Sequence, residues 1–106
     1  MFVDQEGPDP NFSATVAMAD GRAVVTVTGE VDMLTADTMV RAATTDGASA
    51  ATLDLREVTF FDSAAIHAVM RLAERYGSEL TVLPSSQVRR VLEISGLAGQ
   101  PWLSEN

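Results

Sequence analysis

Residues 51–77, ATLDLREVTFFDSAAIHAVMRLAERYG, contain the junction on which the fold depends. Residues 51–55 place Leu53 and Leu55 on one face of an extended chain, which predicts a strand. Residues 63–76 carry apolar side chains at positions i, i+3, i+4 and i+7, the spacing of one helix face. That face consists of Ile66, Val69, Met70 and Ala73, widened by Ala65, Ala68 and Leu72. The stretch therefore predicts a strand that leads directly into an amphipathic helix.

The chain before this stretch predicts a β-hairpin. Residues 12–18 and 23–31 both alternate in hydropathy, as strands with one buried face do. Between them stands Asp20-Gly21, a pair typical of two-residue hairpin turns. We therefore expect two antiparallel strands joined at this turn.

Three further elements are predicted by the same patterns. Residues 35–47 predict a helix that has Thr35 as its N-cap and can end at Gly47. Residues 80–83, LTVL, are expected to form a strand at the centre of a parallel sheet, because such strands are buried on both faces. Residues 85–95 predict a last helix. Its expected buried face consists of Val88, Val91, Leu92 and Ser95.

Together these elements have the order β-β-α-β-α-β-α, which predicts an α/β fold with a mixed β-sheet and helices connecting the later strands. Residues 97–103 follow as a short edge strand or as a loop that docks Trp102. Residues 1–11 contain two prolines, one glycine and three acids, so we expect a flexible N-terminal tail. Residues 12–106 are then one domain.

The composition argues against several classes of function. The chain has 106 residues and a net charge of −8, and all seven of its cations are arginines, so bulk electrostatics disfavours nucleic acid. It has no cysteine for disulfide or thiolate chemistry. No apolar run approaches the roughly 18 residues of a membrane span, and the first residues lack a signal-peptide pattern. We therefore expect a cytoplasmic protein with neither nucleic-acid nor membrane partners.

Asp62 and Ser63 stand at the strand-to-helix junction, where a helix N-terminus exposes free backbone N–H groups. One role is structural, because Asp and Ser are both strong N-caps. Ser63 could instead be a nucleophile paired with His67, although FDSAA lacks the G-x-S-x-G pattern and its glycines. In a third role Ser63 is phosphorylated, which adds about −1.5 to −2 charges to an acidic surface and repels a docked partner.

Four stretches resemble one known family in order and spacing. They are TGEVDMLTA (28–36), LDLREVTFFDS (53–63), VTFFDSAAIHAV (58–69) and VRRVLEISGL (88–97). Together they are similar to the STAS domains of bacterial anti-sigma factor antagonists, over roughly residues 12–103. The resemblance implies a STAS fold.

The resemblance also implies a binding switch that is not an enzyme and uses no cofactor or metal of its own. The unphosphorylated protein would bind a cognate anti-sigma factor, itself a serine kinase, and so release a sigma factor. The kinase would use its own ATP to phosphorylate Ser63 and end the complex, and a serine phosphatase would reset the switch. The alternative is a STAS scaffold or accessory subunit of a signalling or transport complex, which is never phosphorylated.

The partner-binding surface expected from the resemblance surrounds the same serine. It consists of Glu30, Asp32, Met33, Thr35, Asp62, Ser63, Ala64, Ala65 and His67. After the serine, the family pattern is small-Gly-Leu-Gly, whereas this chain has Ala64-Ala65-Ile66-His67. The extra methyl group and the imidazole are expected where the partner would approach.

Overall fold

The computed structural model describes residues 11–104. The strands are β1 (Phe12–Ala19), β2 (Arg22–Val31), β3 (Ala50–Phe61) and β4 (Leu80–Pro84). The helices are α1 (Ala36–Ala43), α2 (Ser63–Tyr76) and α3 (Ser86–Ile94), with short 3₁₀ turns at Thr45–Gly47 and Gly77–Glu79. The predicted order β-β-α-β-α-β-α is confirmed. The predicted tail, residues 1–11, lies outside the described residues except for Asn11, whose carbonyl accepts a hydrogen bond from the Glu30 N–H.

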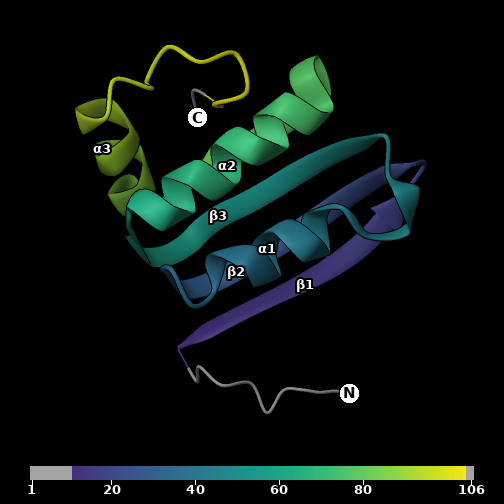
Figure 1. Cartoon of the computed structure of the whole chain (residues 1–106), viewed down its shortest axis with the longest axis horizontal. Helices are drawn as coiled ribbons and strands as arrows, with labels where there is room; N and C mark the ends of the chain where they lie inside the picture. Colours follow the sequence, from purple (N-terminus) through teal and green to yellow (C-terminus); the bar gives the residue numbers. More distant parts are fainter. Residues whose placement is uncertain (1–10, 105–106) are drawn as a thin grey trace.

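The four strands form one mixed sheet in the order β1-β2-β3-β4. β1 and β2 are antiparallel, and the predicted turn between them holds Asp20 and Gly21 at φ 53° and 82°. β2 pairs with β3 and β3 with β4 in parallel, through crossovers that contain α1 and α2. Figure 1 shows these two helices lying side by side along the strands.

Burial alternates along the strands, which shows that the sheet has one covered face and one open face. The covered face of the three parallel strands contains Ala23, Val25, Val27, Ala51, Leu53, Leu55, Leu80 and Val82. The opposite side chains are only half-buried or exposed, and they include Thr26, Thr28, Thr52 and Thr81. α1 packs on β2, and α2 and α3 pack on β3. The core cluster joins the covered face to these helices and includes Val88 and Leu92 of α3.

β3 is longer than the strand predicted at residues 51–55, because it continues through two register shifts relative to β2. The shifts lie between Thr26 and Thr28 and between Gly29 and Glu30, and both place the extra residue on β3. Each bulge changes which side chains reach the core. As a result Val58 and Phe61 are both buried, whereas Phe60 remains 49% exposed.

The structure corrects the predicted place of residues 80–83. β4 is the last strand of the sheet rather than a central one, and on its outer side the described chain adds only a bridge between Val82 and Leu103. Burial in β4 alternates accordingly. Trp102 is buried beside that bridge, as the prediction of a docking loop required.

The helices differ from prediction in their limits and faces. α1 ends at Ala43 and gives way to a 3₁₀ turn before Gly47. In α2 the buried face is rotated, because Met70 is 38% exposed whereas Tyr76, which was not predicted, is buried. α3 buries Val88 and Leu92 but leaves Val91 half-buried and Ser95 exposed.

Candidate functional site

The turn from β3 into α2 gives Asp62 and Ser63 different tasks. Asp62 is the N-cap: its backbone is extended, and its Oδ1 accepts a hydrogen bond of 3.1 Å from the Ala65 N–H. Ser63 is the first residue of the helix and is exposed. Within residues 11–104, the Ser63 hydroxyl has no hydrogen-bond partner. Capping therefore accounts for Asp62 and leaves the Ser63 hydroxyl available.

The loop from β2 into α1 is held by a reciprocal pair of hydrogen bonds between Asp32 and Thr35. The Asp32 N–H donates to Thr35 Oγ1 at 2.9 Å, and the Thr35 N–H donates to Asp32 Oδ1 at 3.2 Å. The pair has the reciprocal pattern of a capping box, but it closes the turn before α1; the predicted N-cap, Thr35, stands at that position and makes no side-chain cap hydrogen bond. The Thr35 hydroxyl also donates to the Glu30 carbonyl at 3.1 Å. The closed loop presents Met33 and Leu34 to solvent, each 78% exposed.

These two junctions meet because β2 and β3 are parallel neighbours that end together, with Val31 opposite Phe61. The carboxyl ends of parallel strands are where α/β folds most often place ligand-binding residues. Here they enclose a hollow of about 460 Å³. Its lining consists of Asp32, Met33, Leu34, Phe60, Asp62, Ser63, Ala64 and His67. We call this set the α2 hollow.

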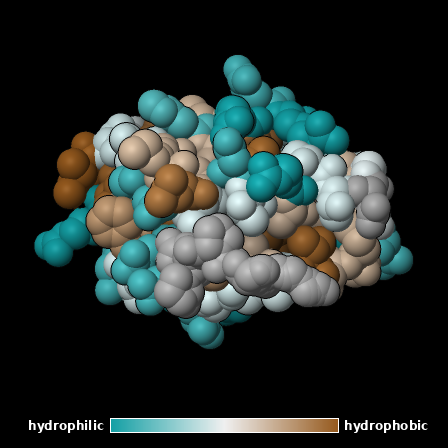
Figure 2. Space-filling view, turned by 60° about the horizontal axis from the view of Figure 1, so that its bottom comes forward, coloured by the Kyte–Doolittle hydropathy of each residue, from teal (hydrophilic) through white to brown (hydrophobic). Residues whose placement is uncertain are grey.

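The α2 hollow combines exposed apolar side chains with a few charged groups. Met33, Leu34 and Phe60 form its apolar part, and each is largely or half exposed. Figure 2 shows apolar side chains gathered toward the end of the molecule at which α2 begins. Exposed apolar groups that cluster beside polar ones are typical of protein-docking surfaces.

Two carboxylates, Asp32 and Asp62, and one imidazole, His67, supply the titratable groups of the α2 hollow. The next cation along the helix, Arg71, is bound elsewhere: it contacts Asp37 of α1 at 2.8 Å. The hydrogen bond and charge of Arg71 hold the pKa of Asp37 below its usual value of 3.8. The hollow is therefore acidic, with His67 as its one basic group.

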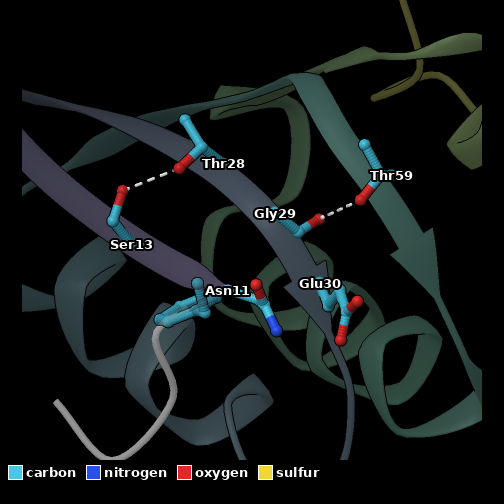
Figure 3. Close-up of a pocket in the computed structure, with 7 residues that line it drawn as sticks. Asn11, Ser13, Thr28, Gly29, Glu30 and Thr59 are labelled. Carbon is cyan, nitrogen blue, oxygen red and sulfur yellow. Dashed lines mark hydrogen bonds between the residues drawn. The ribbon is translucent and has the colours of Figure 1, made fainter.

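Glu30 lies in a different hollow, of about 400 Å³, on the open side of the sheet. Figure 3 shows it beside Asn11, with Ser13 hydrogen-bonded to Thr28 and Thr59 to the Gly29 carbonyl. A side chain at Gly29, where φ is 91°, would put its Cβ 1.8 Å from the Asn11 carbonyl oxygen. Glu30 is linked to the α2 hollow through its strand pairing with Phe60 and through its carbonyl, which accepts the hydrogen bond from the Thr35 hydroxyl.

Two residues that were predicted to lie on the partner-binding surface are buried in the structure. Ala65 is fully buried and Thr35 is 3% exposed, so neither side chain can meet a partner that approaches the folded domain. Both residues act inside the domain. The Ala65 N–H donates a hydrogen bond to the Asp62 side chain, and the Thr35 hydroxyl accepts one from the Asp32 N–H in the loop before α1. The prediction that the Ala65 methyl group lies on the surface is therefore wrong, whereas the imidazole of His67 is exposed as expected.

Sequence reasoning missed Leu34 and Phe60, which both line the α2 hollow. A signal for each was present. Leu34 follows Met33 in a polar loop, where two adjacent apolar residues have no periodic partner face. Phe60 precedes Phe61 at the end of a strand, where adjacent side chains point to opposite faces, so only one of the pair can be buried on a covered face.

The described residues give little support to other chemistries at this site. Ser63 and His67 are not hydrogen-bonded to each other there, so the geometry of an activated serine is not formed. Residues 11–104 contain no group of three or more His, Cys, Asp or Glu side chains placed to hold a metal ion. Over the same range, every helix is too short or too polar to cross a bilayer.

Comparison with known proteins gives one family and several similar structures. The model of the family described as "Mlab, STAS domain" matches residues 14–105. An anti-sigma factor antagonist from Mycobacterium paratuberculosis is 28% identical, with a TM-score of 0.76 over 92% of this chain and 90% of that chain. The comparison with curated proteins gave no match.

Two structures of SpoIIAA share the fold. The anti-sigma factor antagonist SpoIIAA in its unphosphorylated form is 23% identical, with a TM-score of 0.68 over 87% of this chain and 86% of that chain. The Bacillus cell fate determinant SpoIIAA in its phosphorylated form is 22% identical, with a TM-score of 0.66 over 87% of this chain and 89% of that chain. The predicted fold class is confirmed by these structural similarities.

Proposed function

Because the chain belongs to the STAS domain family, we propose that it is an anti-sigma factor antagonist controlled by phosphorylation of Ser63. In its unmodified form it binds a cognate anti-sigma factor and thereby releases a sigma factor. The similarity to the mycobacterial antagonist, at 28% identity over nine-tenths of both chains, supports this role. The action is binding rather than catalysis, and it takes place in the cytoplasm, where sigma factors act.

The observation that carries the proposal is the setting of Ser63. Its hydroxyl is exposed, makes no hydrogen bond within residues 11–104, and opens into a hollow edged by Met33, Leu34 and Phe60. A kinase can reach such a hydroxyl without unfolding the helix. The same residue lines the hollow that a partner would cover, and a charge that must be desolvated in an interface costs binding energy.

Phosphorylation would leave the fold intact and weaken docking. A phosphate on the first residue of α2 is compatible with the helix, because the helix dipole and the first N–H groups favour negative charge. It would add about −1.5 to −2 charges beside Asp32 and Asp62. A partner that buried this surface would have to desolvate all of these anions together, which is unfavourable.

The proposal assigns the modifying enzymes to the partners. The anti-sigma factor is the serine kinase and supplies ATP, and a separate serine phosphatase restores the hydroxyl. The proposed docking residues are those of the α2 hollow, with Glu30 at its border. Thr35 and Ala65 act inside the domain and are not part of the contact.

The first test is the intact mass of the protein recovered from its own host, during growth and under stress, with fragment mapping of any added phosphate. We expect phosphate on Ser63 in an amount that changes with condition. Ser86 is the internal reference, because it is also exposed at the first position of a helix, behind the N-cap Ser85. A protein that is unmodified in every condition, or modified equally at Ser86, would contradict the switch.

One observation favours a second candidate, a STAS scaffold or accessory subunit that is never phosphorylated. His67 lines the α2 hollow, at a position where the family pattern described above has glycine. Ser63→Asp separates the two functions, with Ser86→Asp as the matched control for added charge. The switch predicts that only Ser63→Asp loses the partner, whereas a scaffold that binds through another face tolerates both changes.

A further inference from the structure

We propose that His67 holds the phosphate of phosphorylated Ser63, so that the charge of the switched-off form depends on pH. This inference rests on the proposed function, because it concerns the modified state of the same serine. It assigns His67 a positioning role for the phosphate within this chain. That role differs from a contact with the partner.

The geometry places the two side chains together. Ser63 and His67 are four residues apart on α2, so their Cβ atoms are about 5–6 Å from each other on one helix face. Side chains of an α-helix tilt toward its N-terminus, which directs His67 back over the turn that contains Ser63. Both residues are exposed and both line the α2 hollow. A phosphate is larger than the hydroxyl it replaces and extends further toward the imidazole.

The charges around the hollow leave His67 as the group that can neutralise a phosphate. Asp32 from the β2–α1 loop and Asp62 from the end of β3 face the same space and would repel it. Arg71, one turn beyond His67, is engaged with Asp37 of α1. The remaining lining residues are uncharged. An imidazolium in this position would therefore face two carboxylates and a phosphate.

The consequence is that the titration of the phosphate depends on the residue at position 67. The second ionisation of a phosphoserine occurs near pH 6, and histidine is the side chain that changes charge between pH 5 and 8. A nearby imidazolium favours the dianionic phosphate, so it lowers the pH at which the phosphate loses its last proton. A contact of the strength of a helical i, i+4 ion pair would shift that midpoint by about 0.4 pH units.

The test is a ³¹P NMR titration of protein that carries genetically encoded phosphoserine at position 63. The midpoint of the phosphate titration is measured for the native sequence and for His67→Gln, His67→Arg and Arg75→Gln. We expect His67→Gln to raise the midpoint by about 0.4 pH units and His67→Arg to keep it low. Arg75→Gln removes a charge that lies about 18 Å from Ser63 along α2. This distance exceeds the screening length of about 8 Å, so the midpoint should not change.

An equal midpoint in the native and His67→Gln proteins would contradict the role of His67. So would a shift of the same size in Arg75→Gln, because it would show that overall charge is responsible. The titration contains no anti-sigma factor, so its result is independent of the switch. The switch fails on a different result, namely full binding of the phosphorylated protein to its partner.

Discussion

At the scale of single residues, the junction between β3 and α2 separates stability from function. Asp62 satisfies a backbone N–H of the first helical turn, and its neighbour Ser63 presents a hydroxyl that makes no hydrogen bond to the described residues 11–104. The two residues are adjacent, so a helix that begins firmly at Asp62 also fixes the direction in which Ser63 points. The cap at Asp62 therefore positions the serine that we propose is phosphorylated.

Replacing the cap should cost stability by a predictable amount. We expect Asp62→Ala to lower the free energy of unfolding by about 1 kcal/mol, because the Ala65 N–H loses its acceptor. Asp62→Asn keeps an oxygen acceptor and should retain most of that energy. Urea denaturation of the three proteins checks both statements. Equal stability of Asp62→Ala and the native protein would show that the cap is not effective.

The residues at this site could be predicted from sequence only in part. Asp62 and Ser63 were predicted because they stand at the junction between a strand and a helix, and His67 because it follows Ser63 by four residues and departs from the family pattern; all three line the α2 hollow. Thr35 and Ala65 were misplaced on the surface, because the sequence pattern does not show which polar atoms satisfy each other. Thr35 is buried because its hydroxyl joins two backbone groups, of Glu30 and Asp32, that only the folded loop brings together.

At the scale of elements, α1 and α2 are joined to each other as well as to the sheet. The Tyr76 hydroxyl donates to the Ala43 carbonyl, which connects the end of α2 to the end of α1. Arg71 and Asp37 connect the same helices across the surface at 2.8 Å. The two links join the middle and the end of α2 to α1.

The Arg71–Asp37 link should give the stability of the domain a specific pH dependence. Because the pKa of Asp37 is lowered in the folded protein, the stabilisation is fully present above its ordinary pKa of 3.8 and is lost as the pH falls through the lower value. We expect the stability difference between the native protein and Arg71→Gln to shrink over that range. Urea denaturation from pH 7 downward measures it.

The matched control for that experiment is Arg90→Gln, which removes one exposed arginine from α3. Its effect on stability should change with pH only as overall charge does. A difference between native protein and Arg71→Gln that stays constant through the acidic range would contradict the assigned ion pair.

Element order was predictable, because Asp20-Gly21, Gly77 and the junction at Asp62 mark the ends of elements with specific backbone chemistry. The buried face of each helix and the place of each strand in the sheet were less predictable. The alanine-rich α2 has two adjacent apolar faces, and contact with α1 selects the one that buries Tyr76 and exposes Met70. The polar residues at the first bulge concealed the full length of β3. The apolar composition of residues 80–83 did not distinguish a central strand from the edge strand that they form.

At the scale of the whole molecule, an acidic chain carries the exposed apolar side chains of the α2 hollow beside Ser63, the serine that we propose is phosphorylated. The net charge of −8 disfavours association with other polyanions such as nucleic acid. It also favours a partner that is basic around its binding site. The apolar residues of the α2 hollow then supply affinity, while the charges decide which partner approaches.

The docking surface can be tested with two matched apolar residues. Leu34 in the α2 hollow and Ile94 at the end of α3 are 78% and 79% exposed, so replacing either by Ser should change stability by less than about 0.5 kcal/mol. We expect Leu34→Ser to weaken binding to the anti-sigma factor by at least about fivefold, as for a residue that contributes 1 kcal/mol or more. Ile94→Ser should bind normally. An equal loss of binding in both variants would contradict an interface at the α2 hollow.

The central claim is that phosphate on Ser63 switches off binding, and one calorimetric titration tests it most directly. The dissociation constant of the cognate anti-sigma factor is measured for the unmodified protein and for protein fully phosphorylated at Ser63. The account predicts a loss of about 3–4 kcal/mol, a weakening of several hundred-fold, with the fold unchanged by circular dichroism. Equal affinity of the two forms would contradict the switch.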